Sequence, residues 1–197
     1  GRCMRASAGC RNLFYQNHCR IPCGIHSVFS NTFIFDAEND GKEGYLYSLV
    51  TTSIIQGIKS IPVYVEADVS DGMPLFEMVG SLSPEVKESK ERVRTALKNT
   101  GYILPPKRIT INFIPANIRK TGSGFDLPVV AAVLCAIGIV PEEALKNTMV
   151  VGEISLSGEV KPVNGILPMV AEAKERGVTR CIVPAENQTA VSYTHLT

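Results

Sequence analysis

The feature that most restricts the fold of this chain is a dense succession of structural signals in residues 148–187. Residues 149–152 are apolar, and residues 153–160 alternate apolar with polar side chains, so both stretches predict strands. Asn164-Gly165 predicts a turn. A helix is then predicted at residues 166–176, ending at Gly177, because apolar side chains recur at helical spacing: Ile166, Val170 and Ala173. With a buried strand predicted at residues 181–183, the segment indicates one compact unit of strands and helix.

The length of 197 residues allows one ordinary domain and little more. A net charge of +1 gives no global signature of a nucleic-acid-binding or membrane protein. The longest apolar stretch, residues 127–140, contains Pro128 and is shorter than the roughly 20 residues that span a bilayer, so we expect a buried helix. No signal peptide is evident at the start, and we expect a cytoplasmic protein without membrane contact.

Residues 1–45 do not look like part of a folded domain, because they lack sustained periodicity and mix cysteines with isolated aromatic side chains. Lys42-Glu43-Gly44 can be encoded by AAGGAGG, a bacterial ribosome-binding sequence, and Leu46 by a TTG start codon. We therefore hypothesise that residues 1–45 are a non-native leader from an over-extended reading frame; a native N-terminus upstream of Tyr45 in mass spectrometry would exclude this. We expect no metal site in this segment, because its potential zinc ligands lack a second well-spaced pair: His18, Cys19, Cys23 and His26.

The other end of the chain raises a similar question. Residues 190–196, AVSYTHL, are encoded by transposon mosaic-end DNA, a common sequencing-library remnant. We expect residues 190–197 to be an adapter scar, the domain to occupy residues 46–189, and the natural protein to continue beyond them. Residues 46–189 carry equal numbers of basic and acidic side chains, which argues against strong DNA binding by this domain alone. Cys135 and Cys181 lie among apolar neighbours and are expected to be buried, reduced thiols.

Three strands and a long helix are predicted in the first half of the domain. The strands, at residues 47–55, 62–69 and 75–79, are expected to form a meander. Ser83 is expected to cap a helix that has Pro84 in its first turn, reaches about Asn99 and stops at Gly101. Its predicted buried side chains are Val86, Val93, Ala96 and Leu97. Its charged side chains predict a mixed, solvated face: Glu85, Lys87, Glu88, Lys90, Glu91, Arg92 and Arg94.

A glycine-containing loop, residues 119–128, joins a strand predicted at residues 108–113 to the apolar helix that ends near Gly138. Cations and free backbone N–H groups at the start of a helix could bind an anion. We favour the alternative, a tight turn that admits the helix to the core. The sequence contains no G-x-x-x-x-G-K-[ST] nucleotide-binding loop.

Two stretches carry a family resemblance: GEISLSGEVKPVNGI at residues 152–166 and RCIVPAEN at residues 180–187. They resemble the closing half of the Lon-protease catalytic domain. That fold is shared with the C-terminal domain of the RadA repair protein and with the N-terminal domain of the ComM/YifB magnesium-chelatase-like AAA+ family. The resemblance implies an α+β fold of the ribosomal protein S5 domain 2-like, Lon proteolytic-domain-like type, with a mixed sheet and packed helices.

A Lon-type protease uses a serine hydroxyl that is activated by a desolvated lysine. In that family the serine lies in a G-P-S-A-G loop at the start of an apolar helix, and an ungapped match places Gly124 there. The position that matches the lysine is Met169, whose thioether cannot usefully accept a proton. Ser123 lies one residue from the expected nucleophile and is only a weak candidate. We therefore expect a protease-like fold without catalytic residues.

The resemblance to the ComM/YifB family is closer and covers nearly all of residues 46–187. It includes VEADVSDG at residues 65–72, ERVR at 91–94, PKRITIN at 106–112 and FDLP at 125–128, whereas RadA-like domains match the helix and the KRITIN strand poorly. A departure is Thr121-Gly122-Ser123, where the family usually has Glu-Gly and another residue. The residues that carry the loop and fold motif are Gly122, Asp126, Gly152 and Glu153.

The resemblance implies a three-part parent with this Lon-like N-terminal domain, a P-loop AAA+ module and a C-terminal domain. The expected role is that of a non-catalytic domain in a hexameric ATPase for DNA processing, including branch migration during natural transformation. ATP and magnesium are expected only in the AAA+ module; the expected partners are that module, sister subunits and, as a further candidate, DNA. Candidate anion or DNA contacts are Lys107, Arg108, Arg119 and Lys120. The alternatives are a Lon-like serine peptidase domain, active or degenerate, a RadA-like DNA-repair accessory domain, and a stand-alone magnesium-chelatase component.

Overall fold

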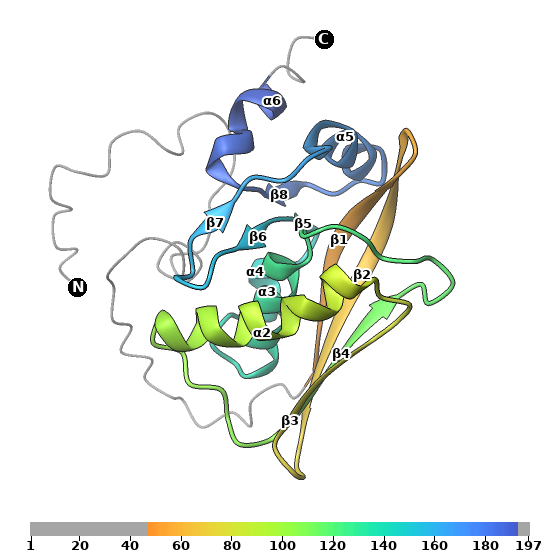
Figure 1. Cartoon of the computed structure of the whole chain (residues 1–197). Coiled ribbons are helices and arrows are strands. Elements are labelled where there is room, and N and C mark those ends of the chain that lie inside the picture. Colours follow the sequence, from red (N-terminus) through yellow and green to blue (C-terminus); the bar gives the residue numbers. More distant parts are fainter. Residues whose placement is uncertain (1–46, 193–197) are drawn as a thin grey trace, which may run out of the picture.

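The computed structural model describes residues 47–192; the expectations for residues 1–45 and for residues 193–197 lie outside the described residues. A six-stranded sheet with the strand order β3-β4-β2-β1-β5-β8 forms its centre, and β6-β7 form a separate two-stranded sheet (Figure 1). The large sheet is mixed, since β1–β2 and β2–β4 are antiparallel whereas β3–β4, β1–β5 and β5–β8 are parallel. The expected α+β fold with a mixed sheet and packed helices is confirmed.

The two longest strands, β1 (Tyr47–Gln56) and β2 (Lys59–Ser70), form a hairpin that turns at Gly57. Gly57 has a φ of +63°, a conformation that glycine adopts easily. The alternating sequence of β2 buries one face of the strand, as predicted: Val63, Val65, Ala67 and Val69.

The expected meander of the first three strands is wrong, because β3 (Leu75–Val79) does not pair with β2. Instead β4 (Arg108–Ile114) lies between them, antiparallel to β2 and parallel to β3. A helix, α2 (Pro84–Asn99), connects β3 to β4, which is the usual link between parallel neighbours. The core side chains of β4 are at most 2% exposed and complete the buried face next to β2: Ile109, Ile111 and Phe113.

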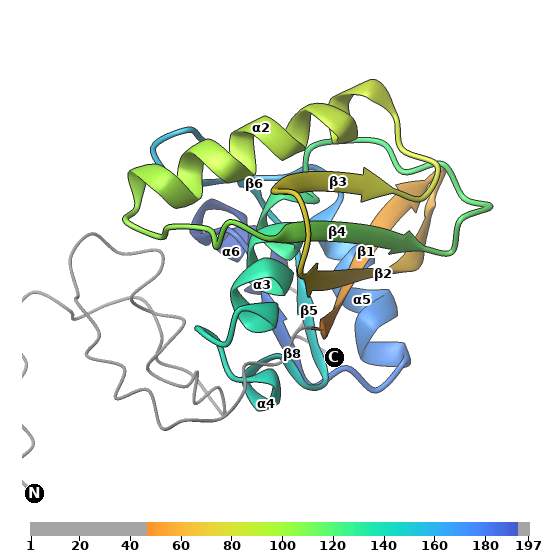
Figure 2. The same cartoon turned by 90° about the horizontal axis from the view of Figure 1, so that it is seen from below.

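Two helices, α2 and α3 (Asp126–Ala136), pack on the buried face of the sheet (Figure 2). α2 reaches from Pro84 to Asn99 and buries the four predicted apolar side chains. Ser83 occupies its N-cap position but makes no side-chain cap hydrogen bond; its backbone N–H donates to Lys120 O at 2.9 Å. α3 is buried on nearly all sides, as its continuous apolar sequence predicts, and it contains the buried Cys135.

A further helix, α5 (Ile166–Glu175), packs against the other side of β1 and β5 (Thr148–Val150). Neighbouring strand residues alternate between the two sides: Ile54 and Val150 join the main core, whereas Ile55 and Met149 join α5. We call the second group the α5 cluster; its buried members are Met149, Val151, Ile166, Met169 and Ala173. The next strand, β8 (Arg180–Ile182), contributes Cys181 to this cluster.

Two local expectations for residues 148–187 need correction. Residues 153–160 are not one strand, because β6 (Glu153–Ile154) and β7 (Val160–Lys161) form a hairpin whose turn contains Gly158 at φ +88°. On α5 the predicted apolar side chains all join one cluster, with Ile166 and Ala173 buried and Val170 partly buried, and Met169 is a further buried member. Cys181 is half-buried, not buried, because β8 is an edge strand of the sheet. Short helices follow the predicted elements: α4 (Glu142–Leu145), η1 (Ala185–Asn187) and α6 (Gln188–Ser192).

Candidate functional site

The candidate site lies where the loop before α3 meets the chain between β5 and β6. Two backbone hydrogen bonds join these segments: Gly152 N–H donates to Gly124 O at 3.1 Å, and Leu127 N–H donates to Gly152 O at 2.9 Å. A Cβ atom at Gly152 would lie 2.9 Å from Leu127 Cδ2 and 3.2 Å from Leu127 Cβ, so a larger residue would force Leu127 to shift. Gly122, exposed and with a φ of +89°, forms the turn that leads into the loop. The loop is thus held in place by backbone contacts that a larger side chain at residue 152 would disturb.

Asp126 is the first residue of α3 and is completely buried. Its carboxylate accepts hydrogen bonds from Arg92 Nε at 2.9 Å and Arg92 Nη2 at 3.0 Å, and from the backbone N–H of Ile154 at 3.2 Å. The hydrogen bonds with Asp126 raise the pKa of the Arg92 guanidinium, with the half-buried Glu153 as a further, weaker cause. Asp126 therefore links α2, α3 and β6 through its hydrogen bonds. Because its carboxylate already places a negative charge at the start of α3, the loop is better explained as a tight turn than as a site for an external anion.

Gly124 and Ser123 occupy the position expected for a Lon-type nucleophile. A Cβ atom at Gly124 would lie 3.4 Å from Val151 Cγ1 and 3.6 Å from Val163 Cγ1, which are ordinary contacts. A side chain at residue 124 would therefore fit and would point toward valines. Ser123 is half-buried, and within residues 47–192 its hydroxyl makes no hydrogen bond to a lysine.

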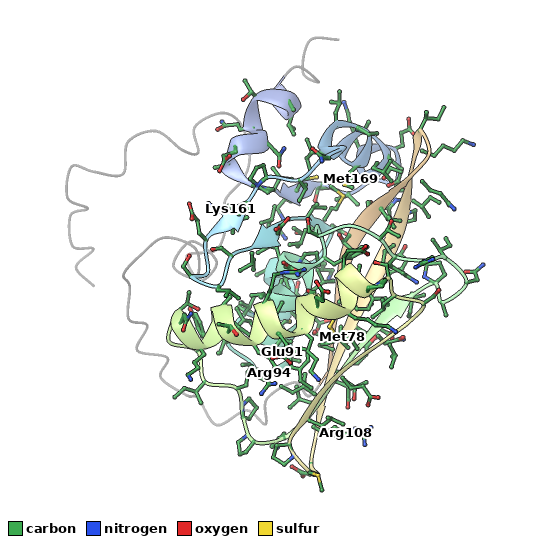
Figure 3. The ribbon with its side chains drawn as sticks, viewed as in Figure 1. Met78, Glu91, Arg94, Arg108, Lys161 and Met169 are labelled. Atoms are coloured by element: carbon green, nitrogen blue, oxygen red, sulfur yellow. The ribbon has the colours of Figure 1, made fainter. Side chains whose placement is uncertain are left out.

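Met169, at the position expected for the lysine of a Lon-type dyad, is 7% exposed in the α5 cluster. Figure 3 shows Met169 on α5 and Lys161 on β7, on separate elements. Lys161 Nζ lies 2.8 Å from Glu159 Oε2, and this hydrogen bond raises the pKa of Lys161. A general base needs a lowered lysine pKa, so Lys161 is not prepared to replace the missing amine.

The four expected anion contacts do not form a common surface. Lys120 is completely buried, and its Nζ donates to Phe113 O at 3.2 Å and to Pro115 O, so the expectation that it contacts DNA is wrong. Burial lowers the pKa of this lysine. At the start of β4, Lys107 Nζ lies 3.1 Å from Asp71 Oδ1 and Arg108 Nη2 lies 3.0 Å from Glu77 Oε2. Figure 3 labels Arg108.

Arg119 is exposed but lies beyond the other end of β4. A seven-residue strand is roughly 23 Å long, so Arg119 is remote from Lys107 and Arg108. The sequence expectation failed here because it grouped cations by their nearness in the chain.

Two residues that organise the site were missed. Arg92 lies one helical turn from the buried Ser89 and Ala96. This spacing could have indicated from the sequence that Arg92 borders the buried side of α2. Asn187 Oδ1 accepts the N–H of Val163 at 2.9 Å while Asn187 Nδ2 donates to Val163 O at 3.0 Å. This double hydrogen bond fixes Val163, the neighbour of Gly124; apart from its place in RCIVPAEN, nothing in the sequence indicates it.

Within residues 47–192, no three histidine, cysteine, aspartate or glutamate side chains gather as a possible metal site. Across the same residues, every helix is too short or too polar to cross a membrane.

Comparison of this chain with known proteins identifies its family. The model of the family described as subunit ChlI of Mg-chelatase matches residues 65–187. YifB of Escherichia coli is 38% identical over 144 residues, which cover 73% of this chain and 28% of YifB. The competence protein ComM of Haemophilus influenzae is 35% identical over 128 residues, 65% of this chain and 25% of ComM.

Two further relatives extend the comparison. An uncharacterized protein of Mycobacterium tuberculosis is 41% identical over 133 residues, 68% of this chain and 26% of that protein. Lon protease 2 of Bacillus subtilis is 36% identical over 127 residues, 61% of this chain and 22% of the protease. The chain spans about a quarter of the length of these curated relatives. It therefore belongs to the ChlI-type, ComM/YifB magnesium-chelatase-like family, whose similarity extends to Lon proteases.

Proposed function

We propose that this domain is a non-catalytic part of a larger magnesium-chelatase-like AAA+ ATPase that acts in DNA processing. Support for the larger parent comes from the relatives YifB and ComM, of which the aligned region is about a quarter. Support for a DNA-related role comes from the name of ComM, a competence protein, and competence is the uptake of DNA for natural transformation. In this proposal the parent promotes branch migration of DNA as a hexameric ring in the cytoplasm.

The observation that carries the non-catalytic part of the proposal is the environment of Met169. Serine activation by a lysine needs an amine that is desolvated and close to the hydroxyl. The α5 cluster supplies the dry surroundings, but residue 169 brings a thioether there instead of an amine. Gly124 offers no hydroxyl at the matching loop position. The domain therefore keeps the shape of a Lon-type fold and serves as a scaffold that contacts its own AAA+ module and sister subunits.

ATP and magnesium belong to the AAA+ module in this proposal, because the sequence has no phosphate-binding P-loop motif. Sequencing the gene downstream of codon 189 tests the architecture. An in-frame Walker A motif followed by DNA-stimulated ATP hydrolysis of the full-length protein is expected. A native stop codon at that point would remove the proposed parent.

A serine-directed phosphonylating probe, from which the serine oxygen displaces fluoride, tests the absence of proteolytic chemistry. The chain and its Ser123→Ala variant are incubated with a fluorophosphonate, with an active serine protease as the positive control. We expect no labelling of Ser123 and no turnover of unfolded protein. Labelling that is lost in Ser123→Ala would overturn the proposal and favour the alternative, a peptidase with a displaced serine, which the similarity to Lon protease 2 keeps as the second candidate.

A further inference from the structure

α2 carries a row of basic side chains along one flank, which we call the α2 basic row: Lys87, Lys90, Arg94 and Lys98. At 100° per residue, these four positions fall within an arc of about 80° on the helix surface. Successive members of the row are three, four and four residues apart, so each side chain lies about one helical turn beyond the preceding one. The charged face that looked mixed in the sequence therefore has a basic side, with Glu91 at its border and paired with Arg94.

The contacts of the opposite flank show which way the row faces. Arg92 reaches Asp126 of α3, and Asn99 Nδ2 donates to Leu156 O in the β6–β7 hairpin at 2.7 Å. Arg92 and Asn99 lie about 150° around the helix from the centre of the row, so the row points away from α3 and the hairpin. Figure 3 shows Arg94 and Glu91 on the same side of α2.

The positive charge of the row is largely uncompensated. Arg94 Nη1 lies 3.5 Å from Glu91 Oε1, a pair within one helix turn whose side chains are at least half exposed. Lys87, Lys90 and Lys98 form no ion pair with any residue in the part of the chain that the structure describes. By contrast, the cations at the start of β4 are each paired with a carboxylate. Within residues 47–192, Lys59 at the start of β2 and Lys174 on α5 also form no ion pair, but they lie on separate elements.

We infer that the α2 basic row binds the phosphate backbone of duplex DNA, an inference that deepens the proposed function and rests on it for its biological setting. Eleven residues of helix separate Lys87 from Lys98, about 16 Å along the axis. Because each strand winds around the duplex axis, its phosphates lie farther apart than the axial rise of about 3.4 Å, and this length matches roughly three of them. The charge complementarity is therefore extended over a continuous stretch of backbone.

The composition of the row favours duplex over single-stranded DNA. Surfaces for single strands combine cations with aromatic side chains on which bases stack, and α2 contains no aromatic residue. Three of the four cations are lysines, which suit phosphate contacts as point charges, and phosphate contacts carry no sequence information. Binding is thus independent of sequence, dominated by counterion release and moderate in affinity, in keeping with the neutral charge balance of the domain.

Fluorescence anisotropy with a labelled 20-base-pair duplex tests the inference on the whole 197-residue chain. The test variant is Lys87→Gln/Lys90→Gln/Lys98→Gln, and the matched control, with the same change of charge, is Lys59→Gln/Lys146→Gln/Lys174→Gln. At about 50 mM salt we expect micromolar binding by the wild type and at least a roughly tenfold loss in the test variant. The slope of log affinity against log salt should fall in magnitude by about 2.7, or 0.9 per lost phosphate contact. The control and a Lys→Arg version of the test variant should bind within twofold of the wild type, and circular dichroism checks the fold of each.

Several results would overturn the inference. Equal weakening in the control variant would mean that net charge alone drives binding. Tighter binding of a 20-residue polyglutamate would identify an acidic protein segment as the occupant, and tighter binding of the single strand would contradict the duplex assignment. No binding by the wild type would also remove the inference, yet leave the proposed scaffold role standing, because that role is judged by fluorophosphonate labelling and by the downstream ATPase module.

Discussion

Asp126 illustrates how one buried charge is stabilised in this domain. A buried carboxylate is costly unless hydrogen bonds and an opposite charge compensate it. Arg92 provides two hydrogen bonds and the positive charge, and Ile154 N–H provides a third hydrogen bond. Removing the arginine leaves a buried, uncompensated carboxylate. The loss in free energy of unfolding should therefore exceed the net stabilisation that the ion pair itself provides.

Arg92→Leu should therefore destabilise the domain by about 2–3 kcal/mol, at the low end for broken buried pairs because Arg92 is partly exposed. Arg94→Leu is the matched control on the same helix, since its exposed pair with Glu91 should contribute less than about 0.5 kcal/mol. Urea unfolding of both variants measures the difference. Equal losses would show that the Arg92–Asp126 contact has no special role.

Met169→Lys tests whether the α5 cluster is dry. The new amine would be buried among apolar side chains, which lowers its folded-state pKa below the roughly 10.4 of the unfolded chain. The unfolded state then binds more protons, so the variant should lose about 3 kcal/mol at pH 7 and regain stability as pH rises toward about 10. Leu167→Lys, on the same helix but 43% exposed, is the control and should show little loss and little pH dependence. A Met169→Lys variant as stable as the control would mean that water enters the cluster.

Cys135 should be unreactive while the domain is folded. Burial raises the pKa of its thiol to about 11 from an ordinary value of 9.0. Between these two values the unfolded chain releases a proton that the folded chain keeps, so this group's contribution to stability is present below pH 9 and is lost as pH rises through about 11. Iodoacetamide labelling at pH 8 with peptide mapping should modify the half-buried Cys181 before Cys135. Fast labelling of Cys135 without unfolding would contradict its burial.

At the scale of elements, the turn from β3 into α2 depends on one glycine. Gly80 has a φ of +116°, and a Cβ atom there would lie 2.4 Å from Phe113 O, a backbone atom that cannot move aside easily. This turn starts the connection that makes β3 and β4 parallel neighbours, so the close approach supports the strand order of the sheet.

Gly80→Ala should destabilise the domain by about 3 kcal/mol or more, from the positive φ and the clash together. Gly101→Ala is the matched control, because Gly101 has a φ of +89° but a Cβ added there would meet no atom within 4 Å. The control should lose only about 1–2 kcal/mol, the cost of the backbone conformation alone. Thermal unfolding of both variants separates the two contributions, and equal losses would exclude the clash.

At the scale of the whole molecule, β1 holds the two helical layers together. Its residues alternate between the main core, which contains α2 and α3, and the α5 cluster on the other side. β3 and β8, by contrast, are the edges of the sheet and have a strand neighbour on one side only, within the part of the chain that the structure describes. The centre of the sheet should therefore open only when the whole domain unfolds.

Hydrogen exchange tests this expectation. Amides of β1 and β2 that pair with each other should exchange with the free energy of global unfolding, whereas amides of β3 and of the β6–β7 hairpin should exchange through smaller openings. Mass spectrometry of deuterated peptides resolves these segments. If the amides of β3 were as protected from exchange as those of β1, β3 would not be an open edge of the sheet. Such protection would suggest that a further strand pairs with β3.

The local elements were largely predictable because their signals lie within a few residues of one another. Alternation identified β2, and Pro84 and Gly101 bracketed α2 almost to the residue. The methionine that stands at residue 169 in place of an amine is likewise readable from the sequence. The cluster around it could not be read in the same way, because its members Ile55 and Met149 come from strands far away in the chain.

What the sequence alone determined about this protein is its set of strands and helices, its family and the side chains that occupy the two dyad positions. Periodicity, turn residues and motif order carry this information, because they depend on neighbours in the chain. Only the tertiary structure decided that β4 separates β3 from β2, that Lys120 is buried, and that the charges of α2 divide into a basic flank and a flank facing Asp126. These outcomes depend on which distant segments pack together, and the free energy of a charged or apolar side chain is set by those contacts.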